Sequence, residues 1–265
     1  NFNRDQIDLA DIALKKIFDN RSIKKILLIA PPDVNESLFD YATTKRGRSN
    51  NYPPYGLGVI ARHLLDNGID VRICNLNHEI LKKCSQSENA SQFDFSATFK
   101  SKLAEEVEEF QPDLIGVTCL FTVTHLSLVD VCNEVKSIEP SWLSKGSRIP
   151  LAVGGVHITH DIDKILTDIP CVDFIFLHEA ELSFLHFIEV VNQKSSPENL
   201  SQLIINTSAD RLSFENRATP EPEHLNVIPA FELMDVAEYS RYGTLGSWYG
   251  FKENGTPIAT VLSNR

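Results

Sequence analysis

Residues 149–181 read IPLAVGGVHITHDIDKILTDIPCVDFIFLHEAE, and this stretch decides the fold. Residues 151–153 form a short apolar run without helical periodicity, which is typical of a buried parallel strand. Gly154 and Gly155 follow at once, and they let a ligand approach the backbone because they carry no Cβ. Residues 172–177 predict the next strand. Ligands of open α/β sheets bind outside the carboxyl ends of the strands, so we expect the floor of a site here.

Similar apolar runs elsewhere predict three more strands, at 25–30, 71–76 and 114–119. Helical patterns alternate with the strands, at 55–67, 95–110, 122–138, 161–167 and 181–191. For the helix over 122–138, Thr122 or Thr124 is the candidate N-cap. This alternation predicts a Rossmann-like, doubly wound, five-stranded parallel sheet.

The remaining segments have less regular sequence patterns. A helix is predicted over 7–18, an irregular loop over 33–51, and no structure is assigned to 77–90. After residue 195 we expect a hairpin (203–206 and 212–215), a proline-rich linker, a short helix over 231–242 and a strand over 258–262. The predicted divisions are a helical extension (1–22), the main domain (23–195), a hairpin and linker (196–257) and the start of a truncated barrel (258–265).

Composition excludes several classes of protein. The net charge of −11 argues against nucleic-acid binding, and no apolar run reaches the length of a membrane span. The polar N-terminus lacks a secretory signal, so we expect a cytoplasmic protein. The odd cysteine count without a CxxC pair predicts reduced thiols at Cys74, Cys84, Cys119, Cys132 and Cys171.

No catalytic motif is present. The sequence lacks GxGxxG after a strand, GxxxxGK[ST], HExxH and GxSxG. We therefore predict no catalytic or metal-ligating residue in this chain. The chemistry must come from a bound cofactor or from a further part of the protein.

The candidate site is a ring of residues at strand ends and helix starts. Small, hydroxyl-bearing and glycine residues there suit a flat, bulky ligand. The candidates are Tyr55, Gly56, Thr118, Leu120, Phe121, Thr122, Gly154, Gly155, Val156, His157, Glu179 and Glu181.

Some of these residues have simpler interpretations. Gly56 equally suits close helix–sheet packing or proximity to a ligand. His157 could be a metal ligand or a hydrogen-bond donor, although a histidine at a loop mouth is more often solvated. Glu179 and Glu181 could form an acid/base pair, but we favour Glu181 as an anion in the first turn of a helix.

Five ordered fragments resemble the N-terminal half of cobalamin-binding radical SAM enzymes. They are KILLIAPP, PPYGLGVIARHLLDNGIDV, PDLIGVTCLFT, LAVGGVHIT and VDFIFLHEAELSFLHF, and they fall between residues 25 and 191. VIPAFELMDVAEY is similar to the segment that joins the two domains in that family. ATVLSNR looks like the first strand of the radical SAM barrel, just before the CxxxCxxC motif of the [4Fe–4S] cluster.

The resemblance implies that cobalamin lies across the carboxyl ends of the strands. Its corrin would face a missing C-terminal barrel, and its nucleotide tail would enter the Rossmann-like domain. The full-length protein would also use a [4Fe–4S] cluster and S-adenosylmethionine. It would be a methyltransferase acting through methylcobalamin, while this chain, lacking the cluster cysteines, would be inactive alone.

Two departures from the family pattern matter. B12 domains with a cobalt-ligating histidine carry Asp-x-His-x-x-Gly after the first strand, whereas residues 31–37 here read PPDVNES. The resemblance then implies cobalt without a protein histidine below it. His178 also replaces the glycine that more often begins the acidic motif, which puts close backbone approach there in question.

Other functions stay open from the sequence. The fold could serve a stand-alone B12-binding or sensor domain without catalysis, or a ring-forming radical SAM relative. A nucleotide-dependent α/β enzyme is a further alternative, against which the missing phosphate-binding motif counts.

Overall fold

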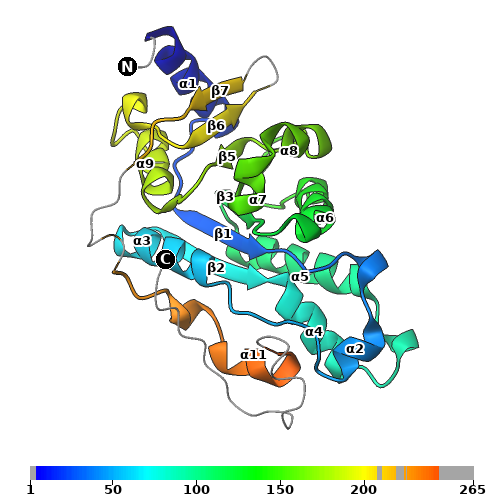
Figure 1. The fold of residues 1–265 in the computed structure, drawn as a ribbon. Helices are drawn as coiled ribbons and strands as arrows, with labels where there is room; N and C mark the ends of the chain where they lie inside the picture. Colours follow the sequence, from blue (N-terminus) through cyan, green and yellow to red (C-terminus); the bar gives the residue numbers. More distant parts are fainter. Residues whose placement is uncertain (1–3, 208–210, 219–223, 225, 245–265) are drawn as a thin grey trace.

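A computed structural model describes residues 4–207, 211–218, 224 and 226–244 of the chain (Figure 1). Its centre is one twisted sheet with helices on both faces. In order across the sheet, the strands are β2 (Asp70–Asn75), β1 (Lys25–Ala30), β3 (Leu114–Thr118), β4 (Leu151–Gly154), β5 (Phe174–Phe176), β6 (Leu203–Asn206) and β7 (Arg211–Phe214).

The first five strands are parallel, which confirms the predicted sheet. The chain moves outward from β1 in one direction to β2 and in the other to β3, β4 and β5. The point where the order reverses, between β1 and β3, is where ligands of such sheets bind. Register brings Thr118 level with Gly154, and Gly154 level with Phe176, at the carboxyl edge.

The predicted hairpin is present, but it is part of the sheet and not a separate segment after it. β6 runs antiparallel to β5, with Ile205 opposite Phe174 and Leu203 opposite Phe176. Leu203, Ile205 and Phe214 are fully buried in the core that the sheet shares with its helices. Apolar burial therefore joins the hairpin to the main domain, while the predicted domain boundaries themselves stay predictions.

Helices cover both faces of the sheet. One face carries α1 (Arg4–Ile17), α3 (Tyr55–Asp66) and α9 (Glu181–Val191). The other carries α4 (Leu76–Gln86), α5 (Phe95–Phe110), α6 (His125–Ser137), α7 (Val156–His160) and α8 (Ile162–Asp168). On β1, Ile26 and Leu28 belong to the first core and Leu27 and Ile29 to the second. Such alternation is expected when both faces are covered.

Two segments hold more structure than predicted. Residues 77–90, left unassigned, lie mostly in α4, whose first turn is capped by the side chain of Asn75. The predicted irregular loop over 33–51 contains a 3₁₀ turn (Glu36–Leu38) and α2 (Tyr41–Lys45). Tertiary contacts stabilise α2: the hydroxyl of Tyr41 bonds that of Ser87 at 3.0 Å. Such contacts leave no periodic pattern in the sequence.

The helix predicted over 122–138 begins differently. It divides into a 3₁₀ turn (Thr122–Thr124) and α6, and neither predicted threonine caps it through its side chain. The hydroxyl of Thr124 instead donates to the carbonyl of Phe121 at 2.8 Å. The helix predicted over 231–242 also divides, into Phe231–Leu233 and α11 (Val236–Tyr242), and the strand predicted over 258–262 lies outside the described residues.

All five cysteines are free thiols, and all but Cys171 are buried. Burial raises the pKa of each of them, that of Cys84 to about 11, so these thiols are protonated and unreactive near neutral pH. Among the described helices, none combines the length and the apolar character that crossing a membrane requires.

Asp173 ties the amino-terminal ends of β4 and β5 together. Its carboxylate is 2% exposed and accepts two bonds from Arg148, at 2.6 and 3.0 Å. Lys136 and the backbone N–H of Leu151 donate to the same carboxylate, at 3.2 and 2.8 Å. A buried carboxylate with four charged or polar donors is costly to disturb, because removing it leaves those donors unpaired.

We predict that Asp173→Asn lowers the free energy of unfolding by about 3 kcal/mol, measured by urea denaturation. Asp163→Asn is the control, because Asp163 is 90% exposed and its pair with Arg211 lies at the surface. The control should change stability by less than about 1 kcal/mol. Equal small effects in both variants would contradict this account of Asp173.

Candidate functional site

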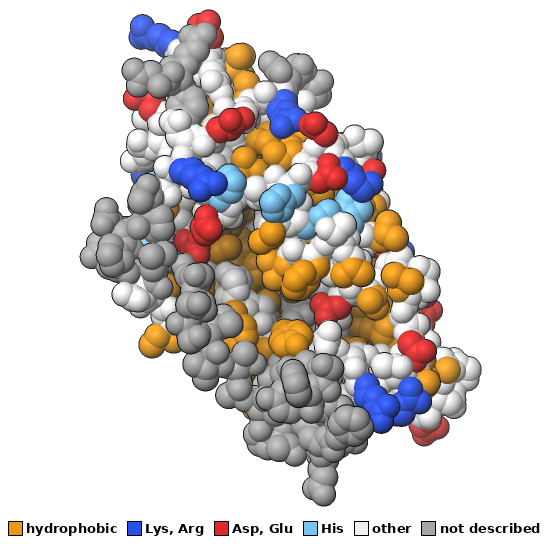
Figure 2. Space-filling model, in the orientation of Figure 1, with side chains coloured by type: hydrophobic (Ala, Val, Ile, Leu, Met, Phe, Trp, Pro, Cys, Tyr) orange, Lys and Arg blue, Asp and Glu red, His pale blue; other side chains and the backbone are white. Residues whose placement is uncertain are grey.

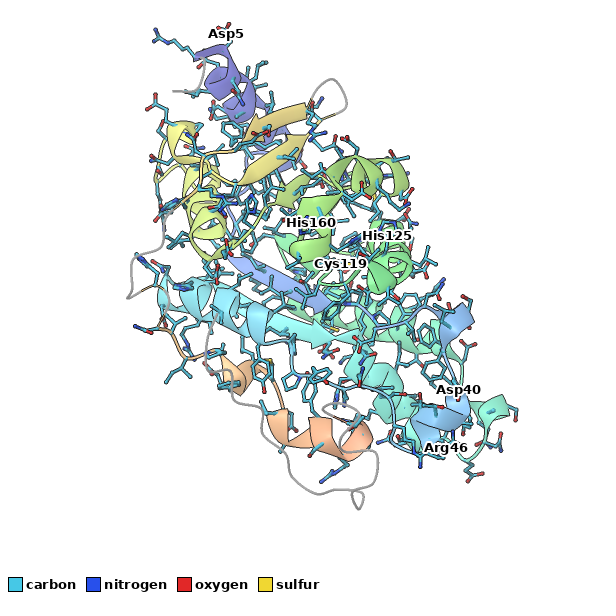
Figure 3. All side chains as sticks on the ribbon, in the orientation of Figure 1. Asp5, Asp40, Arg46, Cys119, His125 and His160 are labelled. Atoms are coloured by element: carbon cyan, nitrogen blue, oxygen red, sulfur yellow. The ribbon has the colours of Figure 1, made fainter. Side chains whose placement is uncertain are left out.

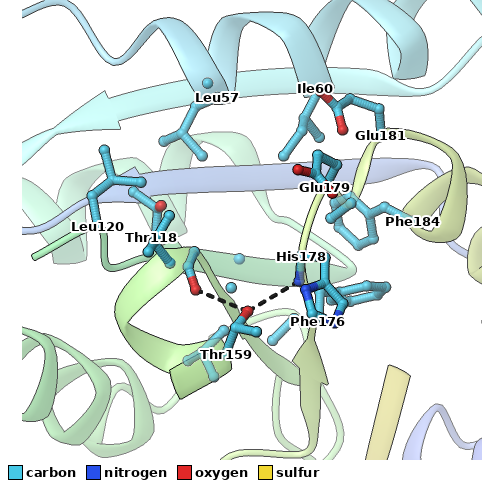
Figure 4. Close-up of a pocket in the computed structure, with 18 of the residues that line it drawn as sticks. Leu57, Ile60, Thr118, Leu120, Thr159, Phe176, His178, Glu179, Glu181 and Phe184 are labelled. Atoms are coloured by element: carbon cyan, nitrogen blue, oxygen red, sulfur yellow. Dashed lines mark hydrogen bonds between the residues drawn. The ribbon is translucent and has the colours of Figure 1, made fainter. Parts of the chain in front are cut away.

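A cavity of about 620 Å³ opens at the carboxyl edge of the sheet, between the strands and helices α3 and α9 (Figure 4). Strand residues form its floor: Leu28, Gly116, Ala152 and Phe176. Helix residues form its apolar wall: Leu57, Ile60 and Phe184. The volume lies within the usual range for sites that bind small molecules or cofactors.

The cavity exists because the positions of β3 and β4 that face α3 and α9 carry small side chains toward the carboxyl ends of these strands. On β3, Ile115 packs into the opposite core, and its neighbour Gly116 faces the cavity. Ala152 and Gly154 repeat this pattern on β4. A Cβ built on Gly116 would lie only 3.0 Å from Cδ2 of Leu28, so even a methyl group begins to fill the floor.

Gly154, which ends β4, and Gly155, which follows it, have different roles. Gly155 has a φ of +120°, and a Cβ there would overlap the carbonyl oxygen of Cys119 and lie 2.9 Å from its carbonyl carbon. Gly155 therefore lets the loops after β3 and β4 touch. A Cβ on Gly154 would make only an ordinary 3.5 Å contact with Phe176. Both glycines line the cavity, but only Gly155 is demanded by the fold.

Eight of the twelve candidate residues line the cavity: Gly56, Thr118, Leu120, Gly154, Gly155, Val156, Glu179 and Glu181. The other four are Tyr55, Phe121, Thr122 and His157. Tyr55 packs edge-to-face against the ring of Phe231. Phe121 is 65% exposed beside the lining residue Leu120.

His157 belongs to a buried chain of hydrogen bonds, so the expectation of a solvated side chain is wrong. Its Nδ1 lies 3.2 Å from the hydroxyl of Thr122, and its Nε2 lies 3.0 Å from Nδ1 of His125. His125 Nε2 lies 2.7 Å from the carboxylate of Asp168, which Lys164 also contacts. Figure 3 labels His125, at the start of α6, and His160, at the end of α7. The chain joins the loop after β3 to helices α7 and α8.

Burial lowers the pKa of His157, and the charge that His125 can carry lowers it further. Asp161 has the opposite influence, and Lys164 and His160 reinforce the lowering. The pKa of Asp168 is lowered by the hydrogen bonds from Lys164 and His125. The folded protein therefore favours a neutral His157 at one end of this chain and an ionised Asp168 at the other.

His178 keeps the backbone geometry expected of the glycine it replaces. Its φ of +56° lies in the left-handed region, which histidine enters more readily than most residues. Its N–H donates to the hydroxyl of Thr159 at 3.0 Å, and that hydroxyl donates to the carbonyl of Gly155 at 3.3 Å (Figure 4). The chain therefore makes the same turn at His178 that a glycine would make there.

The acidic residues lie where the sequence predicts. Glu181 is in the first turn of α9, which is the favoured interpretation of its place, and Glu179 lies exposed just before it. Both line the mouth of the cavity.

Sequence reasoning missed part of the lining. The missed residues are Leu28, Leu57, Ile60, Gly116, Val117, Ala152, Val153, Thr159, His160, Phe176, Ala180, Phe184 and Arg217. The alternation of small and large residues in LIGVT and LAVG is the signal that could have found the floor. Arg217 left no such signal, because the hairpin brings it to the cavity from a distant part of the sequence.

A sequence profile described as the B12 binding domain matches residues 46–188, more than half of the chain. The chain belongs to the B12-binding domain family. The matched segment carries Gly116, Ala152, Gly154 and Gly155, and so most of the cavity. Cobalamin is the cofactor of this family, and the residues present fit it: the cavity is open, and no atom lies within 4 Å of the place a Cβ on the lining residue Gly56 would occupy.

Two curated relatives are methyltransferases by name. The chain is 24% identical over 247 residues to the uncharacterized methyltransferase PH0819 of Pyrococcus horikoshii, covering 92% of this chain and 43% of that protein. It is 25% identical over 182 residues to cytidylyl-2-hydroxyethylphosphonate methyltransferase of Streptomyces wedmorensis, covering 69% of this chain and 31% of that protein. The B12-binding chain thus spans less than half the length of these relatives.

Two solved structures share the fold. The cobalamin-dependent S-adenosylmethionine radical enzyme OxsB with aqua-cobalamin bound has a TM-score of 0.55 at 14% identity, over 83% of this chain and 25% of that one. The radical S-adenosylmethionine methyltransferase TsrM from Kitasatospora setae has a TM-score of 0.50 at 16% identity, over 72% of this chain and 30% of that one. At these identities the likeness shows the fold.

We predict that Gly155→Ala lowers the free energy of unfolding by about 2 kcal/mol or more, because the new Cβ meets the Cys119 carbonyl at a positive φ. Gly154→Ala is the matched control, and it should change stability by less than about 1 kcal/mol. Urea denaturation of both variants measures the difference. Similar losses in the two variants would contradict the distinction drawn between the glycines.

The lowered pKa of His157 also predicts a pH dependence of stability. The unfolded chain binds a proton at this residue near pH 6.5, but the folded chain does so only at lower pH. Its contribution is therefore complete above pH 6.5 and is lost as the pH falls toward the folded pKa. Urea denaturation between pH 8 and pH 5 should show a smaller acid-induced loss of stability in His157→Gln than in the parent chain. Identical pH profiles would contradict this role.

Proposed function

We propose that the chain binds cobalamin, with the nucleotide tail in the cavity and the corrin across the carboxyl edge of the sheet. The observation that carries this proposal is the cavity itself, whose small-residue floor opens at the edge where this fold binds ligands. It coincides with the segment that matches the B12-binding family.

The apolar wall of the cavity suits the base of the nucleotide tail. Ile60, Leu57 and Phe184 offer an apolar wall to a flat aromatic base. The hydroxyls of Thr118 and Thr159 lie among the lining residues and can bond to ribose oxygens. An apolar pocket with a few polar groups at its mouth is the usual form of a cofactor site.

The rim suits the broad face of the corrin. Four apolar side chains at this edge are more than half exposed: Leu120, Phe121, Val123 and Val156. Figure 2 shows apolar surface around a hollow on this side of the molecule. Exposed apolar surface of this extent is typical of a binding face, and a corrin with its surrounding amides would cover it.

The chain offers no histidine after β1 to ligate cobalt. Asp33 lies in the loop three residues after that strand. Burial raises its pKa to about 6, and its N–H donates to the side-chain oxygen of Asn77. Within the described residues, no group of three His, Cys, Asp or Glu side chains could hold a metal ion. We propose that cobalt is bound without a protein ligand from this loop.

We further propose that the longer protein is a B12-dependent radical SAM methyltransferase. Cobalamin, when bound, supplies a cobalt that can carry a methyl group, and this chain holds the corrin in place and excludes water from its tail. The names of both curated relatives support methyl transfer. The fold shared with two radical SAM enzymes supports a cluster and S-adenosylmethionine elsewhere in the longer protein. In this proposal the methyl group is transferred to a carbon or phosphorus atom of the substrate.

We predict that the chain retains hydroxocobalamin through desalting, measured by its visible absorbance. Ile60→Trp should weaken binding by about tenfold or more, because the larger ring fills the apolar wall of the cavity. Ile12→Trp is the matched control, since Ile12 is 62% exposed on α1 and does not line the cavity, and it should bind as the parent does. A parent chain that retains no corrin absorbance would overturn the proposed function.

A further inference from the structure

Arg217 is the one lysine or arginine that lines the cavity within the described part of the chain. It follows β7, so it reaches the site from beyond the parallel sheet. Its Nη2 lies 3.4 Å from Nδ1 of His178. His178 has a left-handed backbone and also lines the cavity. Figure 2 shows a basic side chain beside a histidine and an acidic side chain at the edge of the hollow.

The position of Arg217 is fixed by Gln202, which is 2% exposed. The side-chain amide of Gln202 donates to the carbonyls of Leu177 and Glu179, at 3.1 and 2.9 Å. Its Oε1 accepts from the N–H of Ala218 at 2.8 Å. One buried amide therefore holds the segment after β5 against the segment after β7.

Backbone hydrogen bonds of Gln202 also hold these two segments together. The N–H of Leu177 donates to the carbonyl of Gln202 at 2.8 Å, and the N–H of Gln202 donates to the carbonyl of Asn216 at 3.1 Å. Arg217 is thus held between two anchored neighbours, Asn216 and Ala218. The backbone of Arg217 has a defined place at the mouth, although its side chain is exposed.

The electrostatics of the mouth require a cation if an anion is to enter. Glu179 and Glu181 line the same mouth, and the chain has a net charge of −11. The nucleotide tail of cobalamin carries one formal negative charge, on the phosphodiester that joins the corrin side chain to the ribose. Without a neighbouring cation, that charge would meet repulsion from the exposed carboxylate of Glu179.

We propose that Arg217 binds the phosphodiester of the nucleotide tail and makes the chain select complete cobalamin over corrinoids that lack the tail. Arginine suits this role because its planar guanidinium presents five N–H donors that match phosphate oxygens. The contact with His178 uses one donor and directs the group along the mouth. This inference rests on the proposed function. It gives the segment that follows the hairpin a role in selecting the cofactor.

The test compares two corrinoids on the 265-residue chain. Cobalamin and cobinamide, which has the corrin but no phosphodiester, ribose or base, are titrated in excess cyanide so that cobalt carries the same ligands in both. Dissociation constants are measured for the parent, Arg217→Gln and Arg211→Gln. Arg211 lies at the start of β7, is paired with Asp163 and does not line the cavity, so its variant is the matched control.

We expect Arg217→Gln to weaken cobalamin binding by about tenfold or more and to leave cobinamide binding within about twofold. Arg211→Gln should leave both constants within about twofold. Raising the salt concentration should weaken cobalamin binding by the parent more than by Arg217→Gln. Cobinamide phosphate, which adds the phosphate without the base, should regain part of the affinity with the parent and none with Arg217→Gln.

Three outcomes would overturn the inference while leaving the proposed function intact. They are an unchanged cobalamin constant in Arg217→Gln, an equal loss for cobalamin and cobinamide, or an equal loss in Arg211→Gln. A parent chain that binds neither corrinoid would instead remove the proposed function and this inference with it. Circular dichroism melting of each variant shows that a loss of binding is not a loss of folding.

Discussion

The small side chains on one face of β3 and β4 are the constraint on which the rest of the structure depends. A sheet covered on both faces normally fills both layers with large apolar residues. Here the layer facing α4, α5 and α6 is filled, whereas Gly116, Ala152 and Gly154 leave the layer facing α3 and α9 open at its carboxyl edge. The resulting space can persist because apolar helix residues surround it and the packed opposite layer keeps the strands in register.

The mouth of that space depends on contacts between loops. Gly155 lets the loop after β4 touch the backbone of Cys119, and the His157–His125–Asp168 chain holds the same two loops from behind. On the other side, Gln202 joins the segments after β5 and β7. Rigid support on both sides keeps an open cavity from collapsing before a ligand arrives, which lowers the entropy that binding must overcome.

The hairpin connects fold and site in a way that the parallel sheet alone would not. Its strands continue the sheet beyond β5, and its buried residues belong to the main core. A pocket at the switch point of a parallel sheet is usually built from the loops that follow its strands. In this chain an antiparallel addition supplies one further charged group, Arg217, to an otherwise apolar and acidic mouth.

The sequence by itself determined the five parallel strands, most of the helices and the two glycines at the carboxyl end of β4, because strand and helix periods and missing Cβ atoms are local properties of a chain. Eight of the twelve candidate residues accordingly line the cavity. Only the tertiary structure decided what His157 contacts, where Arg217 lies and which backbone groups the side chain of Gln202 bonds. Those placements depend on contacts between residues that are tens of positions apart. Such contacts leave no periodic pattern in the sequence.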